Sequence, residues 1–397
     1  MGKSGIGEYM EKLNKKVAIC TISSHNYMAY GLTCLLSAKK YNNNCDVYYL
    51  VADDYKEEYY KEYKDVIEFV SLDGLDIEKE AIINMAFKYN IVEFNTAVKP
   101  KFYSYLFSKG YDMVIYLDPD MECYYSFDKL INEYNEYSII VTPHKLTEKE
   151  SELIEDSVFL NNGIYNLGFI AMNRSKDTDA FLNWWDKKLR NQCFVAHEFG
   201  MATDQIWVEL ASTLFDGFCV IKDEGMNVAF WNINERSVKK RDDIYFSNNT
   251  PLIFFHFSSL SAKCSKEFLD KIESINPGFI SFYNEHIDRV KKVGIEKFSN
   301  IEYKYSKYDN GQMITEVDRW IYGFSAKLQD RYTNPFNVSG DTFYKFFCAR
   351  NKIGCDKVLS KKQKLVVRVA NIIGVKKAAN YFGKLSFSLV KTLAELI

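Results

Sequence analysis

The sequence predicts an α/β fold in which strands and helices alternate around one sheet, followed by a helical C-terminal region. Short apolar runs rich in strand formers alternate with helical periodicity in roughly the first 120 of the 397 residues. One such run, residues 114–117, ends in Asp118 and Asp120, and open α/β sheets bind ligands at the carboxyl ends of their strands. Strand signals fade after about residue 261, so we expect helices to form the rest of the chain.

The alternation in the first part of the chain is typical of a parallel, doubly wound sheet. Strands are predicted at residues 17–22, 46–52, 66–70 and 112–117, and helices at residues 27–40, 77–89 and 100–108. The polar loop after the first strand, Thr21-Ile-Ser-Ser-His25-Asn26, lacks a GxGxxG pattern. This absence disfavours a dinucleotide-binding fold.

The pattern changes after Asp120. Further strands are predicted at residues 137–142, 164–172, 219–222 and 252–257, and helices at residues 177–190, 203–210, 265–275, 279–293, 365–373 and 376–396, with a break near Gly374. We therefore expect an α/β domain over residues 1–260, a helical extension over 261–342 and a basic helical tail over 343–397.

The charges are unevenly distributed along the chain. The net charge of −2 argues against a protein that binds nucleic acid over its whole surface. The tail, residues 343–397, holds twelve Lys or Arg and two Asp or Glu, a balance of +10, which leaves −12 on the remaining 342 residues. A basic tail on an acidic body suggests a negatively charged surface as the partner of the tail.

Cysteine usage and the lack of long apolar segments predict a cytoplasmic protein. The nine cysteines are an odd number with no CxxC pair, which fits reduced thiols and not a disulfide framework or a zinc site. The N-terminal residues have no apolar segment typical of a secretory signal. No apolar run is long enough to span a bilayer.

Two carboxylates and a histidine each follow an apolar strand. On an extended backbone Asp118 and Asp120 point the same way, and two hard oxygen ligands suit Mg²⁺ or Mn²⁺ bridging a diphosphate. The alternative is an acidic turn, because Asp and Pro both favour turns. His256 ends the apolar strand at 252–257 and can supply nitrogen to Mn²⁺. Its alternative is a buried, hydrogen-bonded core histidine.

Four other polar or small residues lie at helix starts or on a strand face where they could contact a ligand. Lys99 begins a helix, where a cation suits a phosphate or a sugar hydroxyl, although a solvated lysine is the simpler interpretation. Asn166 and Gly168 share one face of a strand, and the glycine permits close approach of a ligand or marks a bulge. Asp204 begins a helix, where a capping role would suffice.

Taken together, these residues resemble GT-A glycosyltransferases, close to the family-8 type of retaining enzymes, and among them bacterial relatives that make surface polysaccharides. The resemblance covers residues 16–260. Asp118-Pro-Asp120 is similar to the DxD metal motif of that family, and His256 to the late histidine that completes its metal site. The resemblance implies a Rossmann-like mixed sheet with flanking helices.

Three further motifs carry the resemblance, and one is missing. Thr96-Ala-Val-Lys99 resembles a Thr-x-x-Arg that contacts the donor, with Lys in place of Arg. Tyr165-Asn166-Leu-Gly168 resembles the Phe-Asn-x-Gly strand beside the donor sugar, and Asp204-Gln205 matches the Asp-Gln pair that faces the sugar. The usual His-x-x-Gly-x-x-Lys-Pro-Trp segment is absent, which leaves Lys263 as the candidate phosphate-binding lysine.

The resemblance implies a metal-dependent enzyme that moves a sugar from a nucleotide-diphosphate sugar to a saccharide or lipid-linked acceptor, with retention. It implies Mn²⁺ or Mg²⁺ on Asp118, Asp120 and His256, and the sugar against Asn166, Asp204 and Gln205. Thr21, Ser23, Asp53 and Asp54 would meet the nucleoside, with Lys99, Gly168 and Lys263 also near the donor. A sugar nucleotidyltransferase, expected to have a Gly-rich basic first loop, and a non-catalytic sugar-binding scaffold are the alternatives.

The basic tail allows two interpretations. Its apolar residues recur at three- and four-residue spacing between lysines: Leu365, Val366, Val369, Ile372, Val375, Ala379, Phe382, Leu385, Leu389 and Leu393. Such a stripe fits a helix that lies on the anionic inner face of the cell membrane. That location would suit an enzyme with a lipid-linked acceptor. The stripe fits equally a helix that packs on the catalytic body or on a second subunit.

Overall fold

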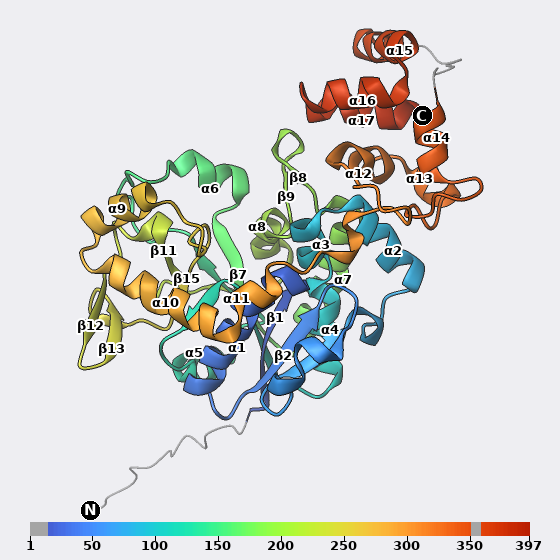
Figure 1. Ribbon diagram of the computed structural model, residues 1–397. Helices are drawn as coiled ribbons and strands as arrows, with labels where there is room; N and C mark the ends of the chain where they lie inside the picture. The colour runs from blue at the N-terminus through green and yellow to red at the C-terminus, as the bar shows by residue number, and fades with distance from the viewer. Residues whose placement is uncertain (1–14, 351–358) are drawn as a thin grey trace, which may run out of the picture.

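The computed structural model describes residues 15–350 and 359–397 and is built around a mixed seven-stranded sheet (Figure 1). The strand order is β10-β6-β7-β4-β1-β2-β3. β4 is parallel to β1, β1 to β2 and β2 to β3, whereas β7 is antiparallel to β4 and β6. The bounds are Val17–Ser23 for β1, Asp46–Val51 for β2, Glu68–Ser71 for β3, Met113–Leu117 for β4, Ile139–Pro143 for β6, Tyr165–Asn173 for β7 and Phe218–Val220 for β10.

The sheet is buried on both faces, which explains the continuous apolar runs that predict its strands. Ile19 and Ile115 face the helices α1 (Met28–Tyr41) and α10 (Phe279–Val293). Their chain neighbours Cys20 and Tyr116 face the opposite layer, which holds the helices α2 (Lys79–Lys88), α4 (Lys99–Ser108) and α7 (Lys176–Gln192). The predicted fold class, a mixed α/β sheet with flanking helices and a helical C-terminal region, is confirmed.

A second, three-stranded sheet fixes the position of the late histidine. β15 (Phe254–His256) pairs antiparallel with β5 (Met121–Cys123) and parallel with β11 (Val228–Ala229). In this register His256 lies opposite Met121, the residue after Asp120. The backbone N–H of Phe257 also donates to the carbonyl of Asp120 at 2.8 Å. Two sequence-distant segments are thereby held side by side.

The other elements flank these two sheets. They are α3 (Ile91–Ala97), α5 (Asp128–Glu133), α6 (Asp156–Asn162), β8 (Val195–Ala196), β9 (Met201–Ala202), α8 (Gln205–Leu214), β12 (Val238–Arg241), β13 (Ile244–Ser247), β14 (Thr250–Pro251), α9 (Lys266–Ile275), α11 (Ile295–Phe298), α12 (Glu316–Gly323), α13 (Ala326–Arg331) and α14 (Phe343–Ala349). The helix α3 is missing from the sequence prediction, although a capping box between Asn90 and Glu93 marks its start.

The tail forms three helices, α15 (Lys361–Ile373), α16 (Val375–Gly383) and α17 (Phe387–Leu396). The single predicted helix at residues 376–396 is therefore wrong. α16 ends at Gly383, and the Ser386 side chain accepts from the backbone N–H of Ser388 and starts a new helix. In Figure 1 the three helices lie beside α12 and α14, at the edge of the molecule away from the sheet.

The predicted apolar stripe of the tail is divided between two environments. Val366, Val375, Ala379, Phe382 and Leu393 are buried in the same core as the α2 side of the sheet, as the packing interpretation requires. Three other stripe residues have exposed side chains: Leu365, Ile372 and Leu385. Contact of these residues with a membrane stays a prediction. The division of the chain into three parts also stays a prediction. Of the predicted tail, residues 351–358 lie outside the described residues, as do residues 1–14 of the predicted α/β domain. No helix in the described part of the chain combines the length and apolarity needed to cross a bilayer.

We predict that Phe387 stabilises the packing of the tail helices against the rest of the protein. Its ring contacts Trp320, Phe324 and Phe199 with centroid distances of 4.6, 4.9 and 5.5 Å. Phe387→Ala should lower the free energy of unfolding by about 3 kcal/mol, because the cavity left behind adds to the lost apolar burial. Urea unfolding measures this loss. The matched control is Leu385→Ala, since Leu385 is 58% exposed and should change stability by no more than about 0.5 kcal/mol. Equal effects of the two variants would contradict the packing described here.

Candidate functional site

A cavity of about 490 Å³ opens at the carboxyl ends of β1 and β4. This is the edge of the sheet where the sequence places the carboxylate pair. Its walls come from the loop after β1, from α3, from the turn between β4 and β5, from β7 and from the end of β15. They include Ser24, Asn26, Tyr27, Ile91, Val92, Asn95, Thr96, Tyr116, Asp118, Pro119, Asp120, Asn166, His256 and Ser258.

Asp118, Asp120 and His256 converge in the wall of this cavity. The His256 Nε2 atom lies 3.0 Å from Asp120 Oδ1 and 3.9 Å from Asp118 Oδ2. One ligand atom from each residue lies within 4.8 Å of the others. The two carboxylates remain partly exposed, with side-chain exposures of 29% for Asp118 and 15% for Asp120. This arrangement offers two oxygens and one nitrogen to a cation that enters from the cavity.

The three groups shift one another's pKa. Burial raises the pKa of Asp118, and the nearby Lys99 opposes this shift only in part. Burial also acts to raise the pKa of Asp120, but the charge of His256 and its hydrogen bond outweigh burial and lower it. The pKa of His256 is raised, because the two carboxylates outweigh the opposing effect of burial. The two carboxylates thus favour positive charge at this position, whether it comes from a proton on the imidazole or from a bound cation.

A relay of side chains behind His256 fixes which ring nitrogen faces the carboxylates. The His256 Nδ1 atom lies 3.1 Å from Asn166 Oδ1, and Asn166 Nδ2 lies 3.3 Å from the Nε2 atom of His144. His144 Nδ1 in turn lies 3.3 Å from the carbonyl of Ile164. Burial lowers the pKa of His144 to about 4, so its ring is neutral near pH 7. A neutral His144 donates to Ile164 and accepts from Asn166, so Asn166 Oδ1 accepts from His256 and leaves Nε2 toward the carboxylates.

The sequence prediction missed His144, although a usable signal exists. His144 directly follows β6, and polar residues at strand ends of one sheet edge tend to meet. Asn166, predicted to contact the sugar, lines the cavity, but both ends of its amide are engaged in the relay. Gly168 lies behind it: a Cβ there would stand 2.6 Å from His256 Cε1 and 2.5 Å from Met121 Cε. The glycine is required for close approach of the histidine itself.

Lys99 and Asp204 form a buried ion pair. Lys99 is 1% exposed, and its Nζ atom donates to Asp204 Oδ2 at 2.6 Å and to the Leu167 carbonyl at 3.1 Å. The ammonium also lies 4.1 Å from the centroid of the Tyr116 ring, whose hydroxyl donates to Asp118 Oδ1 at 2.7 Å. Lys99 therefore contacts the carboxylate cluster only through the Tyr116 ring, and its charge is paired with Asp204.

The helix-cap interpretation of Asp204 is wrong, because its side chain makes no capping hydrogen bond to α8. Its oxygens instead contact Lys99 and the Thr203 hydroxyl. The neighbouring Gln205 accepts from the Leu167 N–H at 2.9 Å and donates to the Asn162 carbonyl at 2.8 Å. In this structure Gln205 thus ties the start of α8 to β7, and Asp204 ties it to Lys99 of α4. The predicted contact of both side chains with a sugar stays a prediction.

The cavity is not lined by the residues predicted to meet the nucleoside: Thr21, Ser23, Asp53 and Asp54. Thr21 is buried and donates to the Leu117 carbonyl at 2.7 Å, and the buried Ser23 hydroxyl contacts the Tyr49 hydroxyl. Asp53 is also buried and accepts from the backbone of Asp54 and Lys304. Lys263 is exposed in the loop between β15 and α9. Roles for these residues toward a donor stay predictions.

Comparison with known proteins gives distant relatives. No family model matches the chain. It is 28% identical over 180 residues to the uncharacterized protein YfnD of Bacillus subtilis (strain 168), a match covering 44% of this chain and 56% of YfnD. It is 24% identical over 247 residues to the uncharacterized protein YfnF of the same organism, covering 61% of this chain and 80% of YfnF. The chain thus spans little more than half the length of the first of these relatives.

Solved structures with a similar fold are glycosyltransferases. The galactosyltransferase LgtC, solved with donor and acceptor sugar analogues, is 16% identical with a TM-score of 0.43, covering 65% of this chain and 94% of LgtC. The glycosyltransferase GlyE of Streptococcus pneumoniae TIGR4 is 14% identical with a TM-score of 0.41, covering 70% of this chain and 64% of GlyE.

We predict a pH-dependent stability that originates at His144. Its pKa falls from an ordinary 6.5 to about 4 on folding, so between these values the unfolded chain binds more protons and stability drops as the pH falls. The drop from pH 7.5 to pH 5 should include about 2 kcal/mol from this residue. His144→Gln should remove that part of the pH dependence in urea unfolding. His197→Gln, at an exposed histidine, is the control. An unchanged slope in His144→Gln would show that the ring is not held neutral.

Proposed function

We propose that the protein is a metal-dependent glycosyltransferase that moves a sugar from a nucleotide-diphosphate sugar to a saccharide or lipid-linked acceptor, with retention of configuration. The observation that carries the proposal is the convergence of Asp118, Asp120 and His256 at the wall of a cavity of about 490 Å³. Their two carboxylates and one imidazole suit Mn²⁺, and Mg²⁺ less well because of the nitrogen. The cavity lies at the sheet edge where α/β proteins bind ligands.

Asp118, Asp120 and His256 would hold the cation. Mn²⁺ or Mg²⁺ supplies neutralising charge for the diphosphate leaving group. The chain contributes the orientation of each ligand: the Tyr116 hydroxyl holds Asp118, the Phe257 N–H holds the backbone of Asp120, and Asn166 holds His256. Because these partners are already in place, little reorganisation is needed when the donor binds.

The cavity walls suggest how the donor lies. The nucleoside would extend from the carboxylates toward Ser24, Asn26 and α3, which also line the cavity. The sugar would lie toward Asn166, with Asp204 and Gln205 behind it at the start of α8. Lys99 acts as a positioning residue in this proposal, since its charge is balanced by Asp204. Beside the metal ion, the side-chain ammonium that would contact the diphosphate is then that of Lys263, on the exposed loop after β15.

The decisive experiment combines donor screening with loss of one ligand. Purified protein, Mn²⁺ and a panel of nucleotide sugars should release nucleoside diphosphate with at least one donor, and transfer should stop with chelator and resume with Mn²⁺. Asp120→Asn should lower the rate by about 100-fold or more while leaving the melting temperature within a few degrees. Release of pyrophosphate from a sugar phosphate and a nucleoside triphosphate would establish a nucleotidyltransferase instead. Binding of sugar without any turnover would establish a scaffold.

A second prediction tests the relay behind His256. Asn166→Ala removes the acceptor that holds His256 Nδ1, so the affinity for Mn²⁺ should fall about 10- to 100-fold. Isothermal titration calorimetry with Mn²⁺ alone measures this without any turnover. The matched control is Asn95→Ala, a change of the same kind in the wall of the same cavity, which should leave the Mn²⁺ affinity unchanged. Equal affinities in the wild type and both variants would show that Asn166 does not orient the ligand.

A further inference from the structure

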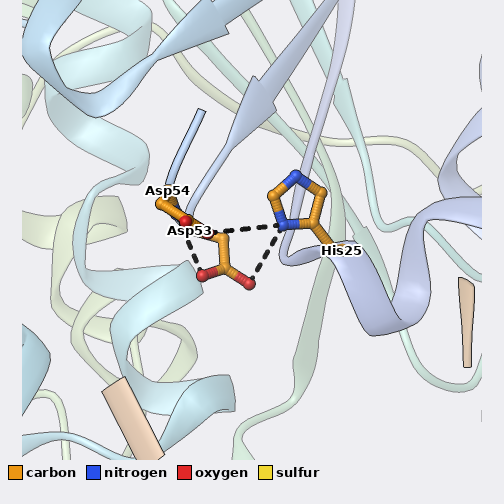
Figure 2. Close-up of side chains that lie close together, drawn as sticks. All are labelled: His25, Asp53 and Asp54. Carbon is orange, nitrogen blue, oxygen red and sulfur yellow. Dashed lines mark hydrogen bonds and ion pairs between the residues drawn. The ribbon is translucent and has the colours of Figure 1, made fainter. Parts of the chain in front are cut away.

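A second cluster of one imidazole and two carboxylates lies at the ends of β1 and β2. His25 belongs to the turn His25–Tyr27 that follows β1, and Asp53 and Asp54 follow β2. Figure 2 shows the three side chains facing one another, with His25 Nδ1 3.3 Å from Asp53 Oδ2 and 3.9 Å from Asp54 Oδ1. β1 and β2 are parallel neighbours with Ser23 opposite Val51. Their carboxyl ends therefore bring these residues to one place.

The cluster contains buried polar atoms that lack hydrogen bonds. The side chains of His25 and Asp53 are both 0% exposed. Among the residues that the structure describes, three buried atoms of the cluster have no hydrogen-bond partner: both ring nitrogens of His25 and the Oδ2 atom of Asp53. The other oxygen of Asp53 is satisfied, since it accepts from the N–H groups of Asp54 at 2.9 Å and Lys304 at 3.2 Å. Such orphaned buried groups are rare in proteins and point to a missing ligand.

The geometry matches that of the first cluster. There, the imidazole nitrogen lies 3.0 and 3.9 Å from the two carboxylate oxygens, against 3.3 and 3.9 Å here. In both clusters the three ligand atoms lie within 4.8 Å of one another. Atoms that bind one transition-metal ion at about 2.0–2.2 Å are separated from each other by roughly 3–4 Å. The cluster of His25, Asp53 and Asp54 therefore has the spacing of a ligand set around a single ion.

We propose that His25 Nδ1, Asp53 Oδ2 and Asp54 Oδ1 bind a second divalent transition-metal ion, of the Mn²⁺ or Zn²⁺ type. One nitrogen and two carboxylate oxygens suit such ions better than Mg²⁺ or Ca²⁺. Access is through Asp54, which is 33% exposed and, with Asp53, lines a separate cavity of about 380 Å³. The ion pair of Lys56 with the other oxygen of Asp54, at 3.3 Å, leaves Oδ1 available.

The second ion would brace one wall of the main cavity. His25 stands between Ser24 and Asn26, which both line that cavity. The backbone of Lys304, from the segment after α11, is bound to Asp53. An ion on His25, Asp53 and Asp54 thus joins the loop after β1, the end of β2 and the helical extension. Its role is structural, because none of its three ligands lines the cavity that holds Asp118 and Asp120.

The competing explanation is a metal-free ion pair between a protonated His25 and Asp53. Asp53, Asp54 and the ammonium of Lys56 are the charged groups near the imidazole, and the Tyr59 ring contacts it edge-on at 4.9 Å. An ion pair of this kind needs no metal. The wild-type chain would then bind one metal ion, at Asp118, Asp120 and His256, and not two. Counting metal ions per chain separates the two explanations.

The test counts ions in the full chain after stripping with chelator, equilibrium dialysis against Mn²⁺ or Zn²⁺ alone, and elemental analysis. Asp120→Asn disables the first cluster, so this variant should retain one ion per chain. Adding Asp54→Asn or His25→Gln to Asp120→Asn should reduce it to less than 0.1 ion per chain. Asp54→Asn is the variant less prone to misfold, because Asp54 is the partly exposed ligand and His25 is buried. Circular dichroism checks the fold of each protein.

The matched control is Asp73→Asn in the same Asp120→Asn background. Asp73 is an exposed carboxylate that lines the same 380 Å³ cavity but stands outside the cluster, so one ion should remain. Bound metal should also raise the melting temperature of Asp120→Asn by several degrees and leave the Asp54→Asn double variant unchanged. The proposal is overturned if Asp120→Asn holds no metal, or if its metal survives Asp54→Asn and His25→Gln. Neither result bears on the transferase proposal, which depends on Asp118, Asp120 and His256.

Discussion

The pairing of β15 with β5 is the constraint on which the candidate site depends. His256 lies far along the chain from Asp118 and Asp120, and only this antiparallel pairing brings its imidazole to within 3.0 Å of a carboxylate. The cost of burying three ionisable groups together is high unless they are paired and hydrogen-bonded. The Tyr116 hydroxyl and the Asn166 amide supply those hydrogen bonds, so the strand pairing and the polar network stabilise one another.

The buried pair of Lys99 and Asp204 extends this network to the helices. Lys99 begins α4 and Asp204 precedes α8, and their contact at 2.6 Å is almost completely shielded from water. A buried charge left without its partner is strongly destabilising. The pair therefore fixes α4, β7 and α8 in one arrangement, with the Leu167 carbonyl as a third member. Gln205 adds two hydrogen bonds to the same junction.

Local signals were enough to predict the seven strands of the main sheet and β15, together with the positions of the carboxylate pair and the late histidine, but not the other short strands. Val17–Ser23 and Met113–Leu117 are buried on both faces, so their apolar runs are continuous and easily recognised. The partners of polar residues were harder to predict, because they depend on contacts across the whole chain. The sequence shows Lys99 at a helix start but not its pairing with Asp204, 105 residues away. His144 was missed although it directly follows β6, and the sequence did not show which strand of the mixed sheet runs antiparallel, which is β7.

The two imidazole–carboxylate clusters occupy neighbouring positions on one sheet edge. The first follows β4, and the second follows β1 and β2, which are adjacent in the sheet. The loop Ser24–Asn26 runs between them and contributes to the main cavity on one side and to the His25 cluster on the other. Since parallel strands all present their carboxyl ends here, one edge supports both polar groups without additional domains. His25 holds this loop through its contacts with Asp53 and Asp54, while its neighbours Ser24 and Asn26 line the cavity that contains Asp118 and Asp120. A short polar turn without glycine thereby forms a defined wall.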